Sequence, residues 1–97
     1  MAETYPLKIV SHEEVLFESS IESLIAPGIM GYLGVLAHHT PLVTMLAEGQ
    51  LTLRINKDEV HYFHVNGGIL EVSAQGVVIL AETIAAVSRS GRPLSSH

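Results

Sequence analysis

The sequence contains no cysteine and no tryptophan, and its aromatic residues are three tyrosines and two phenylalanines. Without cysteine, the chain can form neither a disulfide framework nor a thiolate metal site. With so few aromatic rings, the core must be built mainly from valine, isoleucine and leucine, within a composition that is 47% apolar. These side chains suit the pleated, half-buried surface of a β-sheet.

Positive charge is also scarce. Five lysines and arginines stand against ten aspartates and glutamates, for a net charge of −5. A nucleic-acid-binding domain needs clustered cations to neutralise phosphates. Here the cations are scattered along the chain, at Lys8, Arg54, Lys57, Arg89 and Arg92. The sequence therefore argues against a nucleic-acid partner.

Long apolar runs are missing as well. A helix that spans a bilayer needs about 20 consecutive apolar residues, and the runs in this chain are only a handful long. Residues 1–7 have neither the basic segment nor the apolar segment of a secretory signal. We therefore expect any link to a membrane to run through a partner protein. A length of 97 residues fits one domain.

Short apolar runs alternate with turn residues, which predicts a single all-β domain, a β-sandwich or flattened barrel. In residues 15–25 the odd positions form an apolar face, and we expect two strands joined near Ser19 and Ser20. Residues 56–59 read as a hairpin loop. The other expected strands are residues 7–10, 51–55, 60–65, 69–73 and 77–81.

Three segments need separate treatment. Leu42, Met45 and Leu46 follow Pro41 at helical spacing, but eight residues are few for a helix, so we favour a strand over residues 41–48. Gly67-Gly68 lacks the spacing, lysine and following helix of a phosphate loop, so it is interpreted as backbone shaping through positive φ or close chain approach. Residues 88–97 have no periodicity and are expected to be a loose tail after a domain of residues 1–87.

No residue pattern indicates catalysis, a metal or a cofactor. The histidines at 38 and 39, and those at 61 and 64, would point to opposite faces of a strand and so could not share a metal ion. We interpret them as ordinary turn or surface residues. No serine stands in a nucleophile elbow, and the glutamates at 13, 14, 18 and 22 are interpreted as solvated edge and turn residues. The sequence therefore points to a binding surface as the basis of function.

Three stretches, taken in order, resemble one known family. Residues 31–42 read G-Y-L-G-V-L-A-H-H-T-P-L, similar to that family's G-E-L-G-[IV]-L-P-G-H-A-P-L. Residues 49–54 resemble its G-x-[LIV]-x-[LIV] strand opening, and residues 65–72, V-N-G-G-I-L-E-V, resemble its V-x-G-G-[IF]-[LF]-E-V. The family is the epsilon subunit of F-type ATP synthase (delta in mitochondria), and the resemblance covers about residues 4–87.

The resemblance implies a ten-stranded β-sandwich in the rotor's central stalk, with residues 42–47 as a strand. Such a domain links the gamma subunit to the ring of membrane c subunits and helps couple ion flow to ATP synthesis, while the catalytic residues lie in other subunits. The gamma-facing positions it implies are Ser11, His39, Pro41, Leu42 and Thr44. The positions it implies against the c ring are Ile29, Met30 and Tyr32.

The chain departs from the family pattern in two places of the first motif. Tyr32 stands where the family often has a glutamate, which favours an apolar or hydroxyl-mediated ring contact over a carboxylate-based one. The usual P-G-H-A-P becomes A-H-H-T-P at residues 37–41, which keeps His39 and Pro41 but loses the turn-favouring Pro-Gly.

Longer family members continue into a C-terminal helical hairpin that can inhibit rotation and in some cases binds ATP. Residues 88–91 lack the hairpin's Asp-x-x-Arg-Ala signature, which leaves a natural short form and a truncated chain both open. We expect no specific nucleotide binding.

The function predicted is that of a non-catalytic rotor subunit, held through its partners at the cytoplasmic face of the energy-transducing membrane. The alternative is a free-standing β-sandwich module that binds another protein.

Overall fold

The computed structural model describes residues 3–94 and contains strands and turns there but no helix. None of these residues forms a helix long and apolar enough to cross a membrane. The strands are β1 (Tyr5–Ser11), β2 (Glu14–Ile21), β3 (Ser23–Gly28), β4 (Gly31–Leu36), β5 (Leu42–Met45), β6 (Glu48–Asn56), β7 (Glu59–Ser73) and β8 (Gly76–Val87).

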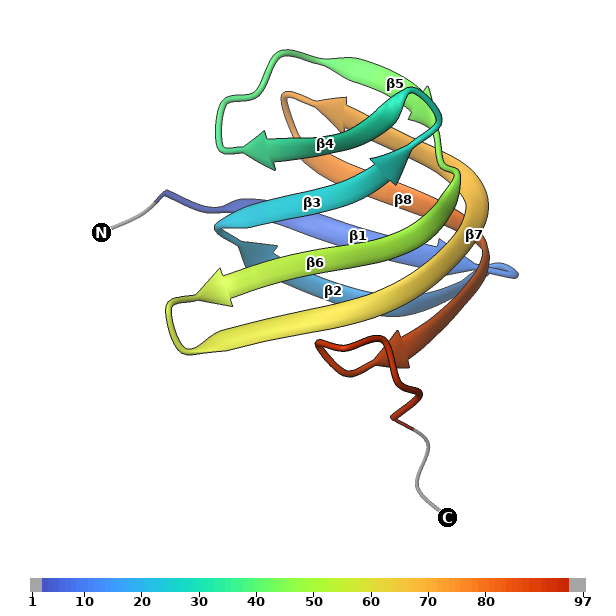
Figure 1. Ribbon diagram of the computed structural model, residues 1–97. Coiled ribbons are helices and arrows are strands. Elements are labelled where there is room, and N and C mark those ends of the chain that lie inside the picture. The colour runs from blue at the N-terminus through green and yellow to red at the C-terminus, as the bar shows by residue number, and fades with distance from the viewer. Residues whose placement is uncertain (1–2, 95–97) are drawn as a thin grey trace.

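All eight strands are joined by hydrogen bonds in the order β2-β1-β8-β7-β6-β3-β4, and β5 pairs with β7 beside this path. The sheet folds over into two layers because β7 and β8 bend and belong to both (Figure 1). The first layer contains β5, β1, β2, the C-terminal half of β7 and the N-terminal half of β8. The second contains β4, β3, β6 and the other halves of β7 and β8.

The expected β-sandwich is confirmed, but the expected count of ten strands is wrong. The residues on either side of Gly67-Gly68 form one strand of 15 residues rather than two, and β8 runs without a break for 12 residues. Both glycines have positive φ, and Gly68 lies so close to β8 that a Cβ there would meet the Leu80 carbonyl oxygen. The glycines therefore bend a continuous strand, which confirms their interpretation as backbone-shaping residues.

The boundary between β2 and β3 also differs from the prediction. It lies at Glu22, because Ser19 and Ser20 continue the ladder between β2 and β1. Glu22, which lies between the two strands, shifts the alternation of buried and exposed side chains. As a result Leu24 and Ala26 are buried while Ile25 is exposed. The strand expected within residues 41–48 is confirmed as the shorter β5.

The core lies between the layers and is aliphatic, as the composition predicted. Its fully buried side chains include Ile9, Leu24, Leu51, Leu70 and Ile79. One polar contact joins the two layers across this core: the Tyr5 hydroxyl on β1 donates a hydrogen bond of 2.6 Å to the Val35 carbonyl on β4. Burial raises the pKa of Tyr5 above its usual value.

The end of the described chain turns back onto β8. The Gly91 amide donates to the Ser88 carbonyl, and the Leu94 amide donates to the Ala86 carbonyl. The side-chain amide of Gln50 on β6 also donates to the Arg89 carbonyl, at 3.3 Å. Residues 95–97 of the predicted tail, and residues 1–2 of the predicted domain, lie outside the described residues.

Candidate functional site

An apolar stripe crosses the outer face of the first layer. The register of the strands places Met45 opposite Ile69, Ile69 opposite Leu80, Leu80 opposite Val10, and Val10 opposite Val15. Four of these side chains are exposed by 42–59% and Val10 is half-buried. Apolar neighbours aligned across five strands form a continuous exposed surface, which is typical of a protein-binding site.

Polar and acidic side chains border the stripe. On one side, a groove of about 490 Å³ runs along it and is also lined by Ser11, His12, Glu13 and Glu82. On the other side lies the next row of residues paired across the same five strands. In this row Glu71, Lys8 and Glu18 stand among valines. The arrangement is an apolar centre with a polar rim, as in the interfaces between protein chains.

Three of the residues predicted to contact gamma lie beside or beneath this stripe. Ser11 ends β1, is buried, and lines the groove. Leu42 and Thr44 on β5 are half-buried and alternate with the exposed Val43 and Met45. The exposed side chains of these strands are therefore the immediate neighbours of the predicted residues.

The other two predicted residues lie at a different place. Pro41 is exposed and His39 half-buried, and both line a hollow of about 430 Å³ near the start of β1 and the β7–β8 turn. A ring nitrogen of His39, Nδ1, lies 2.6 Å from the Thr40 carbonyl oxygen. The structure thus spreads the five predicted residues over two regions rather than one cluster.

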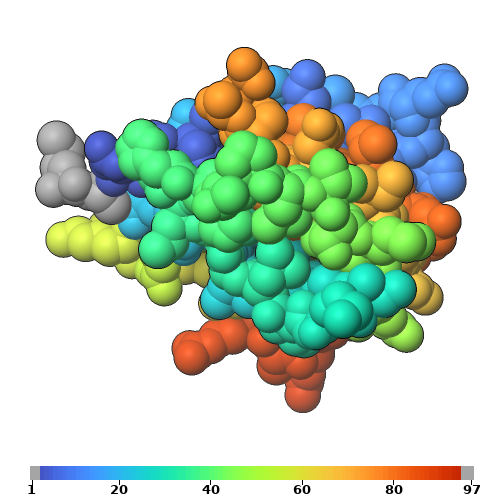
Figure 2. Space-filling model, turned by 90° about the horizontal axis from the view of Figure 1, so that it is seen from above, coloured from blue at the N-terminus to red at the C-terminus, as the bar shows by residue number. Residues whose placement is uncertain are grey.

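The β3–β4 hairpin carries the positions predicted to contact the c ring. Ile29 and Met30 form its tip, and their exposed fractions are 58% and 93%. A methionine with so little contact in its own chain is a feature of binding surfaces, where its flexible thioether adapts to a partner. In Figure 2 this tip, in teal, lies beside the green segment that contains β5.

Tyr32 lies back over the second layer although 61% of it is exposed. It pairs with Pro27 across the hairpin, and its hydroxyl oxygen accepts a hydrogen bond of 3.0 Å from the Gln50 amide on β6. Tyr32 is therefore neither packed into the core nor free at the tip.

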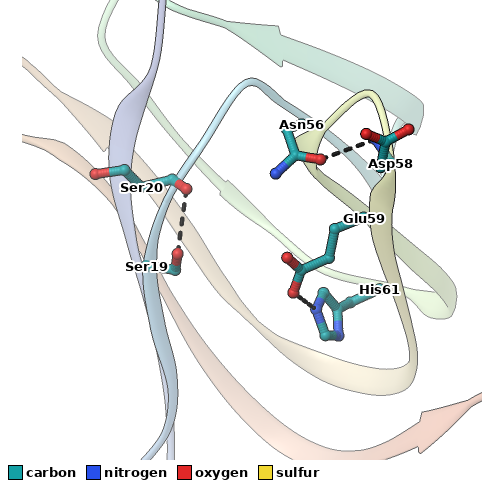
Figure 3. A network of polar contacts seen from close by, with 6 residues as sticks. All are labelled: Ser19, Ser20, Asn56, Asp58, Glu59 and His61. Carbon is teal, nitrogen blue, oxygen red and sulfur yellow. Dashed lines mark hydrogen bonds and ion pairs between the residues drawn. The ribbon is translucent and has the colours of Figure 1, made fainter.

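Three histidines of the described residues, at positions 38, 61 and 64, each pair with one glutamate. His61 Nε2 lies 2.8 Å from a Glu59 carboxylate oxygen, next to the β6–β7 turn where the Asp58 amide donates to the Asn56 side chain (Figure 3). His64 lies 3.2 Å from Glu48. Among residues 3–94, no group of three or more histidine, aspartate or glutamate side chains is arranged to hold a metal ion.

Sequence reasoning missed the outward members of the stripe on β1, β7 and β8. The available signal was the apolar character of both faces in residues 69–73 and 77–81, because a strand with two apolar faces is normally covered on both sides. Register was needed to align Val10, Ile69 and Leu80.

Comparison with known proteins gives a consistent result. The family described as the ATP synthase delta/epsilon chain β-sandwich domain matches residues 4–87. The ATP synthase epsilon chain of Nitrosococcus oceani is 40% identical over 83 residues, which cover 86% of this chain and 59% of the relative. That of Moorella thermoacetica is 44% identical over 77 residues, covering 79% and 58%. This chain thus spans less than two thirds of these relatives.

Two solved structures share the fold. A chain of the Euglena gracilis mitochondrial ATP synthase, in a structure of OSCP, F1 and the c ring, superposes with a TM-score of 0.79 at 22% identity and covers 86% of this chain and 53% of that one. A chain from the Tetrahymena thermophila central stalk and c ring gives 0.71 at 15% identity, covering 86% and 66%. The family match and the curated relatives together show that this chain belongs to the ATP synthase delta/epsilon chain family, with its described residues forming the family's β-sandwich domain.

Proposed function

We propose that this protein is a non-catalytic rotor subunit in the central stalk of an F-type ATP synthase. In this role it links the gamma subunit to the c ring and helps couple ion translocation to ATP synthesis. The observation that supports the proposal most directly is a family β-sandwich with two exposed apolar surfaces, the stripe and the hairpin tip.

We assign the contact with gamma to the stripe. Exposed apolar side chains aligned on five strands need a partner of matching shape, and Ser11 and Thr44 lie next to Val10 and Met45 of the stripe. The charged border favours a fixed orientation of the partner, because rim charges contribute to specificity and association rate more than to affinity.

We assign the contact with the c ring to the hairpin tip. Ile29 and Met30 project there without a carboxylate between them and Tyr32, so the ring contact is apolar in character. Attachment through partners then places the chain peripherally, at the cytoplasmic face of the energy-transducing membrane. Residues 1–87 act as the coupling domain.

Co-purification tests this proposal. A tagged chain should recover gamma and c subunits from solubilised membranes of its own organism, identified by mass spectrometry. Ile69→Glu should reduce recovery of gamma at least about tenfold, because it places a charge within the apolar stripe. The matched control is Ile25→Glu, since Ile25 is 48% exposed and Ile69 42%, and they lie on opposite layers.

Both variants should melt within a few degrees of the native chain, because both positions are exposed. Equal loss of gamma in the two variants, with folding intact, would contradict the assignment of gamma to the stripe. Recovery of an unrelated protein without any ATP synthase subunit would instead support the free-standing binding module.

A further inference from the structure

The hairpin tip is tied by its backbone to the strand that carries Met45. The Ile29 amide donates a hydrogen bond of 2.9 Å to the Met45 carbonyl, and Gly28 forms a β-bridge with Leu46. The Ala47 amide donates a hydrogen bond of 2.8 Å to the Pro27 carbonyl. These contacts, here called the joint, connect the tip directly to the edge of the apolar stripe.

The neighbouring ladder between β3 and β6 stops short of the joint. Its last pair is Ile25 with Thr52. Pro27 has no N–H to continue the ladder, and its carbonyl already accepts the Ala47 amide. The Gln50 amide on β6 therefore turns to another acceptor, which is the Tyr32 hydroxyl oxygen at 3.0 Å.

Gly49 provides the space for this contact. A Cβ at Gly49 would lie 2.5 Å from the Tyr32 hydroxyl oxygen and 2.6 Å from Pro27 Cβ. Both distances are far shorter than van der Waals contact, so any larger residue would push the tyrosine away from Gln50. Tyr32 and Gly49 thus form one complementary pair across the two hairpins.

We propose that Tyr32 is a positioning residue that clamps the β3–β4 hairpin onto β6 and so keeps the joint closed. With the joint closed, the tip and the stripe move as one rigid body, and displacement of the ring contact reaches the gamma contact without being absorbed in the hairpin. This inference rests on the proposed function for its purpose, but the clamp itself is a property of the isolated chain.

Amide hydrogen exchange in the purified 97-residue chain, followed by NMR, tests the clamp. Tyr32→Phe removes the acceptor and should raise the exchange rate of the Gln50 amide about two- to tenfold. Tyr32→Ala also removes the ring and should raise the rates at Ile29 and Ala47 at least about tenfold, while Ile79 in the core keeps its native rate.

Gly34→Ala is the matched control on the same hairpin, because a Cβ there meets only the Leu24 carbonyl oxygen, at 3.9 Å. It should leave all four rates unchanged. Native rates at Ile29 and Ala47 in Tyr32→Ala would overturn the clamp. A rise shared equally by Ile79 would also overturn it, since it would report global destabilisation rather than opening of the joint.

The assembled ATP synthase tests the consequence. Gly49→Ala should lower the ratio of ion pumping to ATP hydrolysis at least about twofold, with gamma still co-purifying in native amount. An unchanged ratio would overturn the coupling role of the clamp. Failure of the native chain to recover gamma would refute the proposed function instead, and the exchange result would then stand by itself.

Discussion

Gly68 is the position where the two-layered fold is most sensitive to a single methyl group. It has a φ of 133°, in a region that side-chain-bearing residues rarely adopt, and β8 passes directly beside it. In Gly68→Ala, the new Cβ would overlap the Leu80 carbonyl oxygen and lie 3.0 Å from Ala81 Cα. Both neighbours are backbone atoms of the adjacent strand, so neither can rotate away.

The cost follows from these two effects. An L-residue held at such a backbone angle costs about 1–3 kcal/mol, and overpacking against a fixed neighbour costs about 1–3 kcal/mol more. We therefore expect the free energy of unfolding to fall by at least about 2 kcal/mol. For a domain of this size, that corresponds to a loss of roughly 8–16 °C in melting temperature.

Thermal and urea unfolding followed by circular dichroism measure this change. Gly34→Ala is the control, since its backbone angle is not in the restricted region and its Cβ has room. It should melt within about 3 °C of the native chain. If Gly68→Ala were as stable as Gly34→Ala, the account of β7 as one strand bent at its glycines would be refuted.

Three further predictions follow from other positions. Because burial raises the pKa of Tyr5, its contribution to stability is complete below about pH 10 and is lost as pH rises above that value. Tyr5→Phe should remove this alkaline slope and cost about 0.5–1.5 kcal/mol at neutral pH by removing the hydrogen bond to the Val35 carbonyl, both measurable by urea unfolding. Met30→Asp should uncouple ATP hydrolysis from ion pumping in the assembled enzyme. Its melting temperature should change by less than about 3 °C, because Met30 is 93% exposed. A large loss of melting temperature with normal coupling would contradict the ring contact. Titration of the chain with ATP should give only small, diffuse amide NMR shifts, and saturable shifts around one pocket at sub-millimolar ATP would contradict the absence of a nucleotide site.

Local patterns in the sequence were sufficient to predict the class of fold. The alternation in residues 51–55 and the turn at residues 56–59 match β6 and its hairpin. Residues 60–65 and 69–73 were predicted as two strands because a Gly-Gly pair looks the same in sequence whether it ends a strand or bends one. That distinction depends on the approach of β8 to Gly68, a contact between residues distant in the sequence.

The candidate surfaces were predictable only in part. Positions 29, 30 and 32 were predicted from the family resemblance, and the structure places Ile29 and Met30 at an exposed tip. The contact between Tyr32 and Gln50 was not predictable, since it joins residues 18 apart through a gap left by Pro27. The stripe depends on register across five strands, which hydrophobic alternation within one strand cannot supply.

Site-specific crosslinking in the assembled complex tests the central claim most directly. The native chain has no cysteine, so one introduced thiol is unique within it. We expect Met45→Cys to crosslink to gamma, Met30→Cys to crosslink to a c subunit, and Asp58→Cys at the β6–β7 turn to crosslink to neither. Assembly of all three variants with no crosslink from position 45 or 30 would contradict a rotor subunit that bridges gamma and the c ring through these two surfaces.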